Sequence, residues 1–478
     1  MEEVMEKKNK LERELDQWIA QFYGRTQKGR KPEKEQKALA AGKNAKNKEP
    51  GKKWTASGKT AGGKNDGGKP GGRKTDKTRK DSIKKTAVQE KGNHLCPVFA
   101  RCGGCQLLHL PYEQQLKQKQ KMMEELLKGI CPVHPIVGME NPWHYRNKVH
   151  AVFDHDRKGN AISGVYEAGS HRVVPVDTCL LENEQADKII GTIRGMLKSF
   201  KIKTYDEDTG YGFLRHVLIR WGHATGQFMV VLVTASPVFP SRNHFVKALL
   251  EKHPEITTIV QNVNNRGTSM VLGEKEHVLY GKGYIEDVLC GCTFRISSKS
   301  FYQINPVQTE KLYRKAVEAA GLQGRETVID AYCGIGTIGM IAAPYAAKVI
   351  GVELNPDAVK DAVSNKKANG QKNIQFYCND AGRFMREMAG RGEKADVVFM
   401  DPPRSGSTEE FIGTVCELKP ERVVYISCGP ETLARDLRIF MAKGYRVKGA
   451  WPFDLFPHTE EHVETVALLS REKSTRRK

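Results

Sequence analysis

The chain has 478 residues, a mean hydropathy of −0.53 and a formal charge of +21, which describes a polar, basic protein with room for about two to four domains. No window holds the roughly 18 apolar residues of a membrane span, and the N-terminal sequence MEEVMEKKNKLERELDQWIA is too charged for a secretory signal or a transit peptide. We therefore expect a cytoplasmic protein without membrane contact, whose eleven cysteines stay reduced.

The first 95 residues are the most basic part of the chain. They hold 26 Lys and Arg against 13 Asp and Glu, and so carry +13 of the total charge of +21. Residues 1–23 predict a short helix, because apolar residues recur there at helical spacing. Residues 25–91 are rich in Gly, Lys, Asn and Thr, and we predict that they are disordered. A tail of this composition favours a nucleic-acid partner, although a purely solubilising tail has the same composition.

Two ordered regions are predicted after this tail. Residues 106–128 have a helical pattern, and residues 133–295 contain short β-patterned runs such as KVHAVFDH and GQFMVVLVTA, typical of a mixed or antiparallel β domain with one or two helices. From residue 327 onward strands and helices alternate, which predicts a parallel, doubly wound sheet. The predicted fold class is α/β, with a basic extension over 1–93, a mixed α+β domain with a cysteine cluster over 94–298, and a Rossmann-like domain over 299–478.

A glycine-rich turn in VIDAYCGIGTIGM is the first candidate cofactor site. Gly334, Gly336 and Gly339 form G-x-G-x-x-G after a buried strand, and Glu353 ends the next strand, where it can accept hydrogen bonds from ribose hydroxyls. This pattern alone also fits a nicotinamide dinucleotide. Asp330 and Tyr332, which precede the first glycine, form a pattern common where S-adenosylmethionine (SAM) lies along the turn.

The sequence MDPPRSG favours SAM over a dinucleotide. Asp401-Pro402-Pro403 follows the fourth strand of the alternating region, and Asp-Pro-Pro at that place is typical of nucleobase methyltransferases. The two prolines stiffen the loop beside which a flipped base can lie. We therefore predict a C-terminal SAM-dependent methyltransferase domain.

Cys428 ends the strand of RVVYISCGPETLARDL, at the edge where α/β enzymes carry their chemistry. Methyl transfer to an exocyclic amine requires no thiol, but carbon 5 of uracil becomes a good nucleophile once a thiolate has added to carbon 6. A base must then remove the proton from carbon 5. Cys428 is the candidate nucleophile, and Glu464, Gln303 and Asp401 are candidates for the base and for the groups that hold the uracil.

Five motifs together resemble the RNA uracil-5-methyltransferase family: FYQINP, DAYCGIGTIG, DPPRSG, VVYISCGPETLARDL and HVETVALL, in the order of that family. The resemblance covers about residues 94–470. It implies Cys428 as the nucleophile and Glu464 as the base. It also implies that the cofactor and uracil site is lined by Gln303, Tyr332, Glu353 and Asp401, with Gly334 and Gly336 in the cofactor turn.

Three cysteines lie within the ten residues CPVFARCGGC, namely Cys96, Cys102 and Cys105, and Cys179 is the candidate fourth ligand. This spacing indicates a metal site in a reducing compartment, and it fits zinc as well as an iron–sulfur cluster. The resemblance implies a 4Fe–4S cluster, as in many members that act on ribosomal RNA. We interpret the remaining cysteines, Cys290 and Cys292 among them, as packing residues.

The resemblance implies methylation of carbon 5 of a uridine in RNA, with 23S ribosomal RNA as the expected substrate because transfer-RNA members often lack the cysteines. A departure from the family is that residues 1–95 show no strand pattern, so we expect no N-terminal TRAM barrel. The alternatives are the same chemistry on transfer RNA, methylation of a base amine, a non-catalytic RNA-binding or ribosome-assembly factor, and a nicotinamide oxidoreductase. A monomer is expected.

Overall fold

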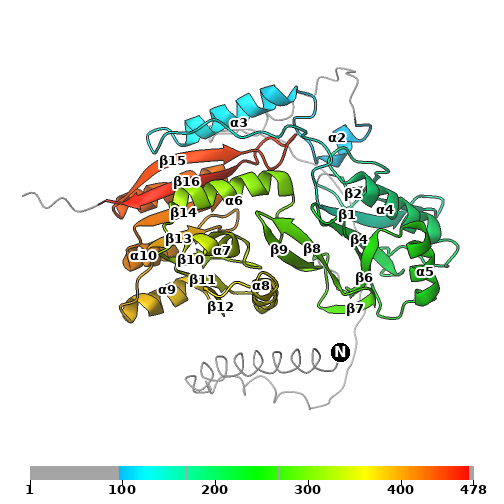
Figure 1. The fold of residues 1–478 in the computed structure, drawn as a ribbon. Helices are drawn as coiled ribbons and strands as arrows, with labels where there is room; N and C mark the ends of the chain where they lie inside the picture. The colour runs from blue at the N-terminus through cyan, green and yellow to red at the C-terminus, as the bar shows by residue number, and fades with distance from the viewer. Residues whose placement is uncertain (1–95, 168, 267–269, 473–478) are drawn as a thin grey trace, which may run out of the picture. The chain divides into compact units, whose positions relative to one another are not determined.

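The computed structural model describes residues 96–167, 169–266 and 270–472 (Figure 1). All described residues belong to one compact unit, which spans residues 90–478. The predictions for residues 1–93, including the absence of a TRAM barrel, lie outside the described residues. No helix within the described ranges is long and apolar enough to cross a membrane.

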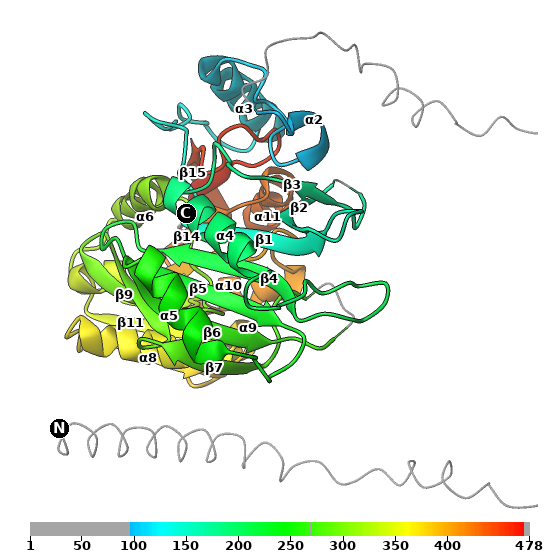
Figure 2. The same cartoon turned by 90° about the vertical axis from the view of Figure 1, so that its right-hand side faces the viewer.

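The first large sheet has the order β3-β2-β1-β4-β5-β6-β7, and only the β5–β6 pair is parallel. Helices α4 and α5 cover one of its faces and face the viewer in Figure 2, and the core between them and the sheet includes Val149, Ala151 and Phe153 of β1. The bounds are β1 Lys148–His155, β2 Ala161–Tyr166, β3 Val173–Pro175, α4 Glu184–Met196, β4 Leu214–Trp221, β5 Phe228–Thr234, α5 Arg242–Lys252, β6 Ile256–Val263 and β7 Lys275–Tyr280. The predicted mixed β domain is confirmed.

A hairpin of β8 (Tyr284–Leu289) and β9 (Cys292–Ser297) connects this sheet to the second one. Its backbone is held by two amides of helix α8 (Pro356–Ala368) and its C-cap: Thr293 N–H donates to Asn369 Oδ1 and Arg295 N–H to Asn365 Oδ1, both at 2.8 Å. The hairpin therefore lies against the C-terminal half of the chain.

The second large sheet has the order β12-β11-β10-β13-β14-β16-β15, with five parallel strands followed by an antiparallel pair. Helices cover both faces, as in a doubly wound Rossmann-like fold, so the predicted fold class is confirmed. The bounds are α6 Pro306–Ala320, β10 Thr327–Ala331, α7 Thr337–Ala342, η1 Ala343–Tyr345, β11 Lys348–Glu353, β12 Ile374–Cys378, α9 Ala381–Gly390, β13 Val397–Met400, α10 Glu409–Leu418, β14 Arg422–Ser427, α11 Pro430–Ala442, β15 Tyr445–Phe453 and β16 Glu464–Arg471.

The predicted helix over 106–128 is α3, Tyr112–Leu126, which follows the short helix α2, Phe99–Cys102. Met123 and Leu127 are fully buried in the core of the second sheet, whose strands come from a distant part of the sequence. Burial of two such side chains contributes about 1.5–3 kcal/mol each. Beyond α3, Val133 and Val137 form bridges to Ala450 and Phe453 of β15, so this N-terminal segment packs on the edge of the C-terminal sheet.

Candidate active site at the carboxyl edge of the parallel sheet

Three neighbouring parallel strands bring predicted site residues to one edge of the sheet. Ala331 of β10 pairs with Met400 of β13, and Met400 pairs with Tyr425 of β14. The residues that follow these strand ends include Tyr332, Asp401 and Cys428, which come from parts of the sequence almost one hundred residues apart. The carboxyl edge of an open parallel sheet is the usual place for a ligand, and the register assembles the candidates there.

Cys428 and Glu464 lie opposite each other across the antiparallel β14–β16 pair. Ser427 pairs with Thr465, so the next step of the same ladder brings Cys428 to Glu464. Glu464 is buried, with 2% of its surface exposed, and its Oε2 atom has no hydrogen-bond partner among the described residues. A buried carboxyl oxygen without a partner, next to a half-buried thiol, is the arrangement that a proton acceptor for bound substrate requires.

Burial and, after it, the neighbouring charges raise the proton affinity of the groups at this edge. Burial raises the pKa of Asp401 to about 7. Burial, and then the charge of Asp401, raise the pKa of Glu464 to about 8, whereas the Arg404 guanidinium opposes this rise. Burial together with the charges of Glu464 and Asp401 raises the pKa of Cys428 to about 12, again opposed by Arg404. Without ligands, the Cys428 side chain is therefore a neutral thiol at neutral pH.

The glycine turn after β10 forms a cradle beside this pair. Tyr332, Gly334 and Gly336 all have positive φ, and a Cβ added at Gly336 would come within 2.6 Å of the Phe376 ring. The N–H of Gly334 donates to Glu353 Oε2 at 3.1 Å. The strand-end carboxylate of Glu353 is half-buried and keeps lone pairs free for ribose hydroxyls.

These residues fit SAM as a ligand. A sulfonium cation is favoured by acidic neighbours, and Asp330, Asp401 and Glu464 are buried acids of this edge. Burial raises the pKa of Asp330 to about 7, although the N–H of Gly339 donates to its Oδ2 at 2.7 Å and lowers it. Tyr332 packs against Phe411 of α10, with ring centroids 5.0 Å apart.

Gln303 joins this site to the first sheet. Gln303 is 8% exposed, and its backbone carbonyl accepts a hydrogen bond of 2.8 Å from Nδ2 of Asn147, one residue before β1. Gln303 also neighbours Tyr313 of α6. Burial and the charge of Asp401 raise the pKa of Tyr313, while hydrogen bonds with the Thr337 and Gln303 side chains lower it.

Tyr313, Thr337 and Arg404 are site residues that the sequence analysis missed. Tyr313 is fully buried and lies among Gln303, Asp401 and Glu464, but in sequence it is one of several apolar-face residues of a helix. Arg404 follows the prolines of MDPPRSG and neighbours both Cys428 and Glu464. Its place in that motif is the signal that would have identified it.

The four predicted metal ligands come from two separate segments. Burial contributes most to the raised pKa of Cys105, and the nearby Cys102 and Cys96 raise it further. The Arg146 guanidinium neighbours both Cys105 and Cys179. The backbone N–H of Cys179 donates to Asp187 Oδ2 at 2.8 Å. All four thiols are free, but in the described part of the chain no three His, Cys, Asp or Glu side chains converge closely enough to hold a metal ion. The thiols are thus gathered in one region, with donor chemistry that fits an iron–sulfur cluster, without forming a closed ligand set.

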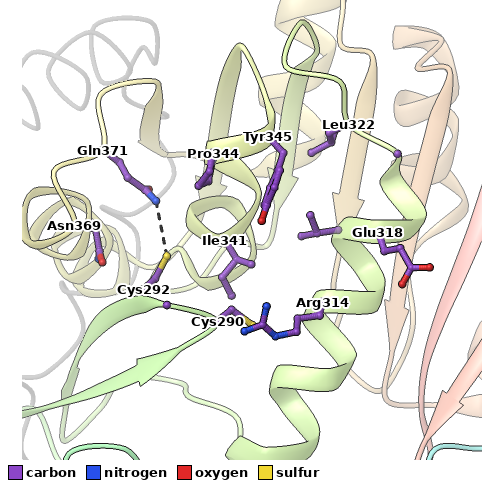
Figure 3. Close-up of a pocket in the computed structure, with 13 residues that line it drawn as sticks. Cys290, Cys292, Arg314, Glu318, Leu322, Ile341, Pro344, Tyr345, Asn369 and Gln371 are labelled. Carbon is purple, nitrogen blue, oxygen red and sulfur yellow. Dashed lines mark hydrogen bonds between the residues drawn. The ribbon is translucent and has the colours of Figure 1, made fainter.

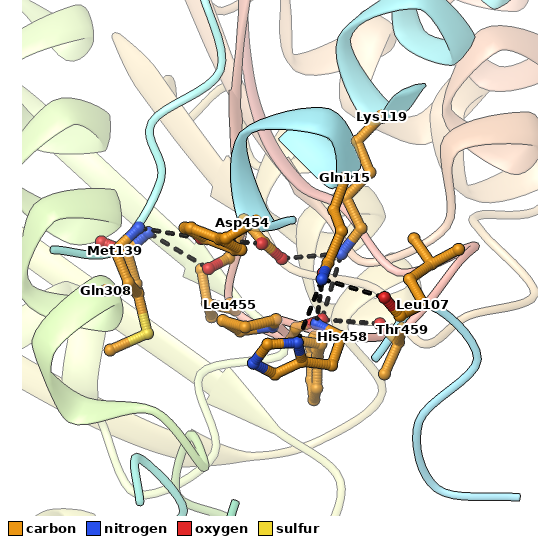
Figure 4. A network of polar contacts seen from close by, with 12 residues as sticks. Leu107, Gln115, Lys119, Met139, Gln308, Asp454, Leu455, His458 and Thr459 are labelled. Carbon is orange, nitrogen blue, oxygen red and sulfur yellow. Dashed lines mark hydrogen bonds and ion pairs between the residues drawn. The ribbon is translucent and has the colours of Figure 1, made fainter. Parts of the chain in front are cut away.

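The loop between β15 and Glu464 is held by helix α3 (Figure 4). Lys119 Nζ pairs with Asp454 Oδ1 at 2.7 Å, both side chains being fully buried, and Tyr112 donates to Asp454 Oδ2 at 2.9 Å. Gln115 accepts the N–H of His458 at 3.0 Å, and His458 in turn accepts the N–H of Leu107 at 3.0 Å. The segment that carries the cysteines is therefore bonded directly to the loop that precedes Glu464.

A cavity of about 560 Å³ lies elsewhere, between the β8–β9 turn, α6 and η1 (Figure 3). Cys290, Cys292, Arg314 and Tyr345 line it, and Gln371 Nε2 contacts Cys292 Sγ at 3.8 Å. Tyr345 precedes β11, so this cavity lies toward the amino edge of the parallel sheet. It contains none of the predicted catalytic or cofactor residues.

The chain is similar to several RNA methyltransferases. A sequence profile of the tRNA (uracil-5-)-methyltransferase family matches residues 269–472. A protein of Halalkalibacterium halodurans described as an uncharacterized RNA methyltransferase is 44% identical over 379 residues, which cover 78% of this chain and 82% of that protein. One of Listeria monocytogenes (strain EGD-e) with the same description is 43% identical over 378 residues, covering 78% and 83%. The crystal structure of Pyrococcus abyssi tRNA (uracil-54, C5)-methyltransferase with S-adenosyl-L-homocysteine matches with a TM-score of 0.65 and 28% identity, over 77% of this chain and 86% of that chain.

Proposed function

The chain belongs to the RNA uracil-5-methyltransferase family, SAM-dependent enzymes that act on RNA, and from this premise we propose that it methylates carbon 5 of a specific uridine in 23S ribosomal RNA through a covalent intermediate on Cys428. The observation that carries the covalent route is the position of Cys428 opposite the buried, unpartnered carboxyl of Glu464, with Asp401 beside them. A methyltransferase acting on an exocyclic amine requires neither the thiol nor the second acid.

In the proposed reaction the Cys428 thiol releases its proton to water and its sulfur bonds to carbon 6 of the uracil, so that electron density moves to carbon 5. When bound, SAM would supply an electrophilic methyl group to carbon 5, and S-adenosylhomocysteine would leave. The Glu464 carboxylate then takes the proton from carbon 5, the bond between carbon 6 and Sγ breaks, and the thiolate is restored.

The proposed roles of the remaining residues follow from their neighbours. Glu353 would hold the ribose of the cofactor, with Gly334 and Gly336 lining its turn and Tyr332 beside it. Gln303 and Asp401 would hold both the uracil and the reacting end of the cofactor, since both neighbour Tyr313 between the two sheets. Arg404 would stabilise the thiolate, because it opposes the rise in the pKa of Cys428.

We also propose that Cys96, Cys102, Cys105 and Cys179 bind a 4Fe–4S cluster with a structural role. The support is the donor set, four free thiols in one region near Arg146. Closure of the ligand set requires these side chains to move toward one another. The cluster would then tie the loop after β3 to the segment that precedes α3.

Transfer RNA is the second candidate substrate. It is favoured by the names of the matching profile and of the Pyrococcus abyssi enzyme, and 23S ribosomal RNA by the cysteines. The basic residues 1–95 are proposed to tether either RNA through its phosphates.

The test is methyl transfer from labelled SAM to unmodified 23S ribosomal RNA and, separately, to unmodified transfer RNA, followed by digestion and identification of the labelled nucleoside. We expect 5-methyluridine from 23S ribosomal RNA, loss of label with Cys428→Ala, and full label with Cys416→Ala, a half-buried free thiol on α10. Label from transfer RNA alone would overturn the substrate. A labelled amine, or a Cys428→Ala variant that still transfers methyl groups, would overturn the mechanism.

A further inference from the structure

The first sheet carries a second cavity on the face that α4 and α5 leave open. It has a volume of about 850 Å³, which is within the usual range for ligand sites. Its walls come from β1, β2, β4 and the loops beside them, and include His150, Asp154, Tyr166, Tyr205, Arg215 and His216. On β1, side chains alternate between faces, so Val149, Ala151 and Phe153 pack against the helices while His150, Val152 and Asp154 face the cavity.

Two neutral histidines in this cavity have nitrogen atoms without partners. His216 is 5% exposed, and neither its Nδ1 nor Nε2 of His150 has a hydrogen-bond partner among the described residues. The two rings lie 5.0 Å apart. Burial lowers the pKa of His150 to about 4 and that of His216 to about 3, so both are uncharged at neutral pH. A hydrogen-bonding ligand would satisfy these nitrogens in place of water, and neutral rings offer it single donors and acceptors rather than charge.

The remaining walls are aromatic and charged, with the carboxylates of Asp154 and of residues 206–208 beside the guanidinium of Arg215. The Arg215 guanidinium lies 4.6 Å from the ring centroid of Tyr205, and the Tyr166 hydroxyl donates to Glu207 Oε1 at 3.2 Å. Aromatic rings and guanidinium planes are the surfaces on which unstacked RNA bases stack. The carboxylates of Asp154 and of residues 206–208 also line the cavity, and they repel phosphate but accept hydrogen bonds from exocyclic amines.

Strand β1 leads from the candidate active site to this cavity. Asn147, one residue before β1, donates to the carbonyl of Gln303. Because a strand rises about 3.3 Å per residue, His150 lies roughly 10 Å along the strand from that contact. The cavity therefore lies along β1 from the contact with Gln303, one of the residues proposed to hold the uracil.

We propose that this cavity binds a second, unstacked nucleobase of the RNA substrate, one that carries an exocyclic amine: adenine, cytosine or guanine. The inference rests on the proposed function for the identity of the ligand as RNA. It adds a specificity site, since reading a second base restricts which uridines reach Cys428. Uracil and thymine lack the amine and fit the acidic wall less well.

The first test measures binding of short oligo(A), oligo(C) and oligo(U) to the full chain by fluorescence anisotropy. We expect Tyr166→Ala to weaken oligo(A) and oligo(C) about 10-fold, as loss of one stacked base does, and oligo(U) much less. Tyr166→Phe removes the hydroxyl but keeps the ring, and should retain most of the affinity. The matched control is Tyr280→Ala, an exposed tyrosine on β7 outside the cavity, which should change nothing.

A second variant, His216→Phe, removes the unpartnered nitrogen and keeps an aromatic ring, and should also weaken oligo(A) and oligo(C). Equal weakening of oligo(U), no weakening by Tyr166→Ala, or the same effect from Tyr280→Ala would overturn the inference. The methyl-transfer assay separates the two proposals. If wild type makes 5-methyluridine while Tyr166→Ala leaves the KM for RNA unchanged, only the second base site is wrong; base-selective binding without 5-methyluridine would contradict the proposed function alone.

Discussion

Glu464 combines deep burial, an unpartnered oxygen and a position opposite Cys428, so its carboxyl group is where the proposed mechanism is tested most directly. Glu464→Gln keeps the shape of the side chain but removes the base. Addition of Cys428 and methylation should still occur, whereas elimination should stop. We expect turnover to fall about 100-fold or more, in the range of general-base catalysis, and a covalent protein–RNA complex to accumulate on denaturing gels.

The matched control for this experiment is Glu461→Gln, an exposed acid three residues earlier in the same loop. It should turn over normally and form no stable complex. An inactive Glu464→Gln variant without any covalent complex would mean that Glu464 acts before methylation, and the assignment of the base would be wrong.

The same carboxyl group should make stability depend on pH. Burial raises the pKa of Glu464 from 4.5 to about 8, so the folded protein keeps a proton that the unfolded chain releases between these values. The contribution of Glu464 is therefore fully present below about pH 4.5 and is lost as the pH rises through about 8. The Glu464→Gln variant has no carboxyl group at this position, so it does not lose this stability as the pH rises. We expect the free energy of unfolding of Glu464→Gln minus that of wild type, measured by urea denaturation, to increase by roughly 2–5 kcal/mol from pH 5 to pH 9. A difference independent of pH would contradict the raised pKa.

At the scale of elements, the contact between α3 and the β15–β16 loop depends on one buried ion pair. Lys119→Met leaves the carboxylate of Asp454 buried without its cation, which costs about 3–5 kcal/mol. We expect chemical denaturation to show this loss of stability. We also expect a lower kcat, because the β15–β16 loop leads to Glu464. Lys119→Met combined with Asp454→Leu removes both charges and should recover much of the stability.

Lys121 provides the matched control on the same helix. Its side chain is 77% exposed and its ammonium lies 3.8 Å from Oε1 of Glu125, so Lys121→Met should change stability by about 0.5 kcal/mol or less. Equal effects of the two substitutions would show that the α3 contact does not depend on the buried charge.

This contact also marks the limit of what the sequence predicts. The doubly wound fold and the meeting of Asp401 and Cys428 follow from alternating strands, since the carboxyl ends of parallel strands share an edge. The packing of α3 against the C-terminal sheet does not follow from the sequence. The buried residues of this helix are Gln115, Lys119 and Met123, and two of these three are polar. In a sequence, polar residues at helical spacing indicate a solvent-exposed helix face. The partners of Gln115 and Lys119 lie more than 300 residues away, so the sequence pattern does not reveal them.

Within the site, the sequence identifies residues that follow the ends of strands, because the neighbouring residue types mark those ends. Cys428 and Asp401 follow apolar strands and precede glycine or proline, which marks them as strand ends. Tyr313 carries no such mark, because a tyrosine on the apolar face of a helix is normally a core residue. Its role as a neighbour of Gln303 and Asp401 depends on how α6 packs across the sheet. The boundaries at residues 93 and 298 remain predictions.

At the scale of the whole molecule, the proposed cluster can be tested by metal analysis. Protein purified without oxygen should hold about four iron atoms per chain with broad visible absorbance, and Cys179→Ser should lose most of both. Cys131→Ser, a half-buried free cysteine between α3 and Val133, should retain them. Removal of iron from wild type should lower the Tm, because metal binding stabilises the folded state. Protein that contains zinc, or no metal under these conditions, would contradict the assignment.

The bond between Gln115 and His458 spans 343 residues, and this has a consequence for how the protein is made. At about 5–20 residues per second, a ribosome needs roughly 20–70 s to synthesise the loop after it has synthesised α3. During that time Met123, Leu127 and the uncompensated Lys119 have no partner surface. Nascent chains therefore expose the apolar side chains of Met123 and Leu127 to chaperones, and a chain released early lacks both the contact of α3 with the β15–β16 loop and Glu464. The proposed methyl transfer therefore requires that the ribosome has synthesised the β15–β16 loop and Glu464.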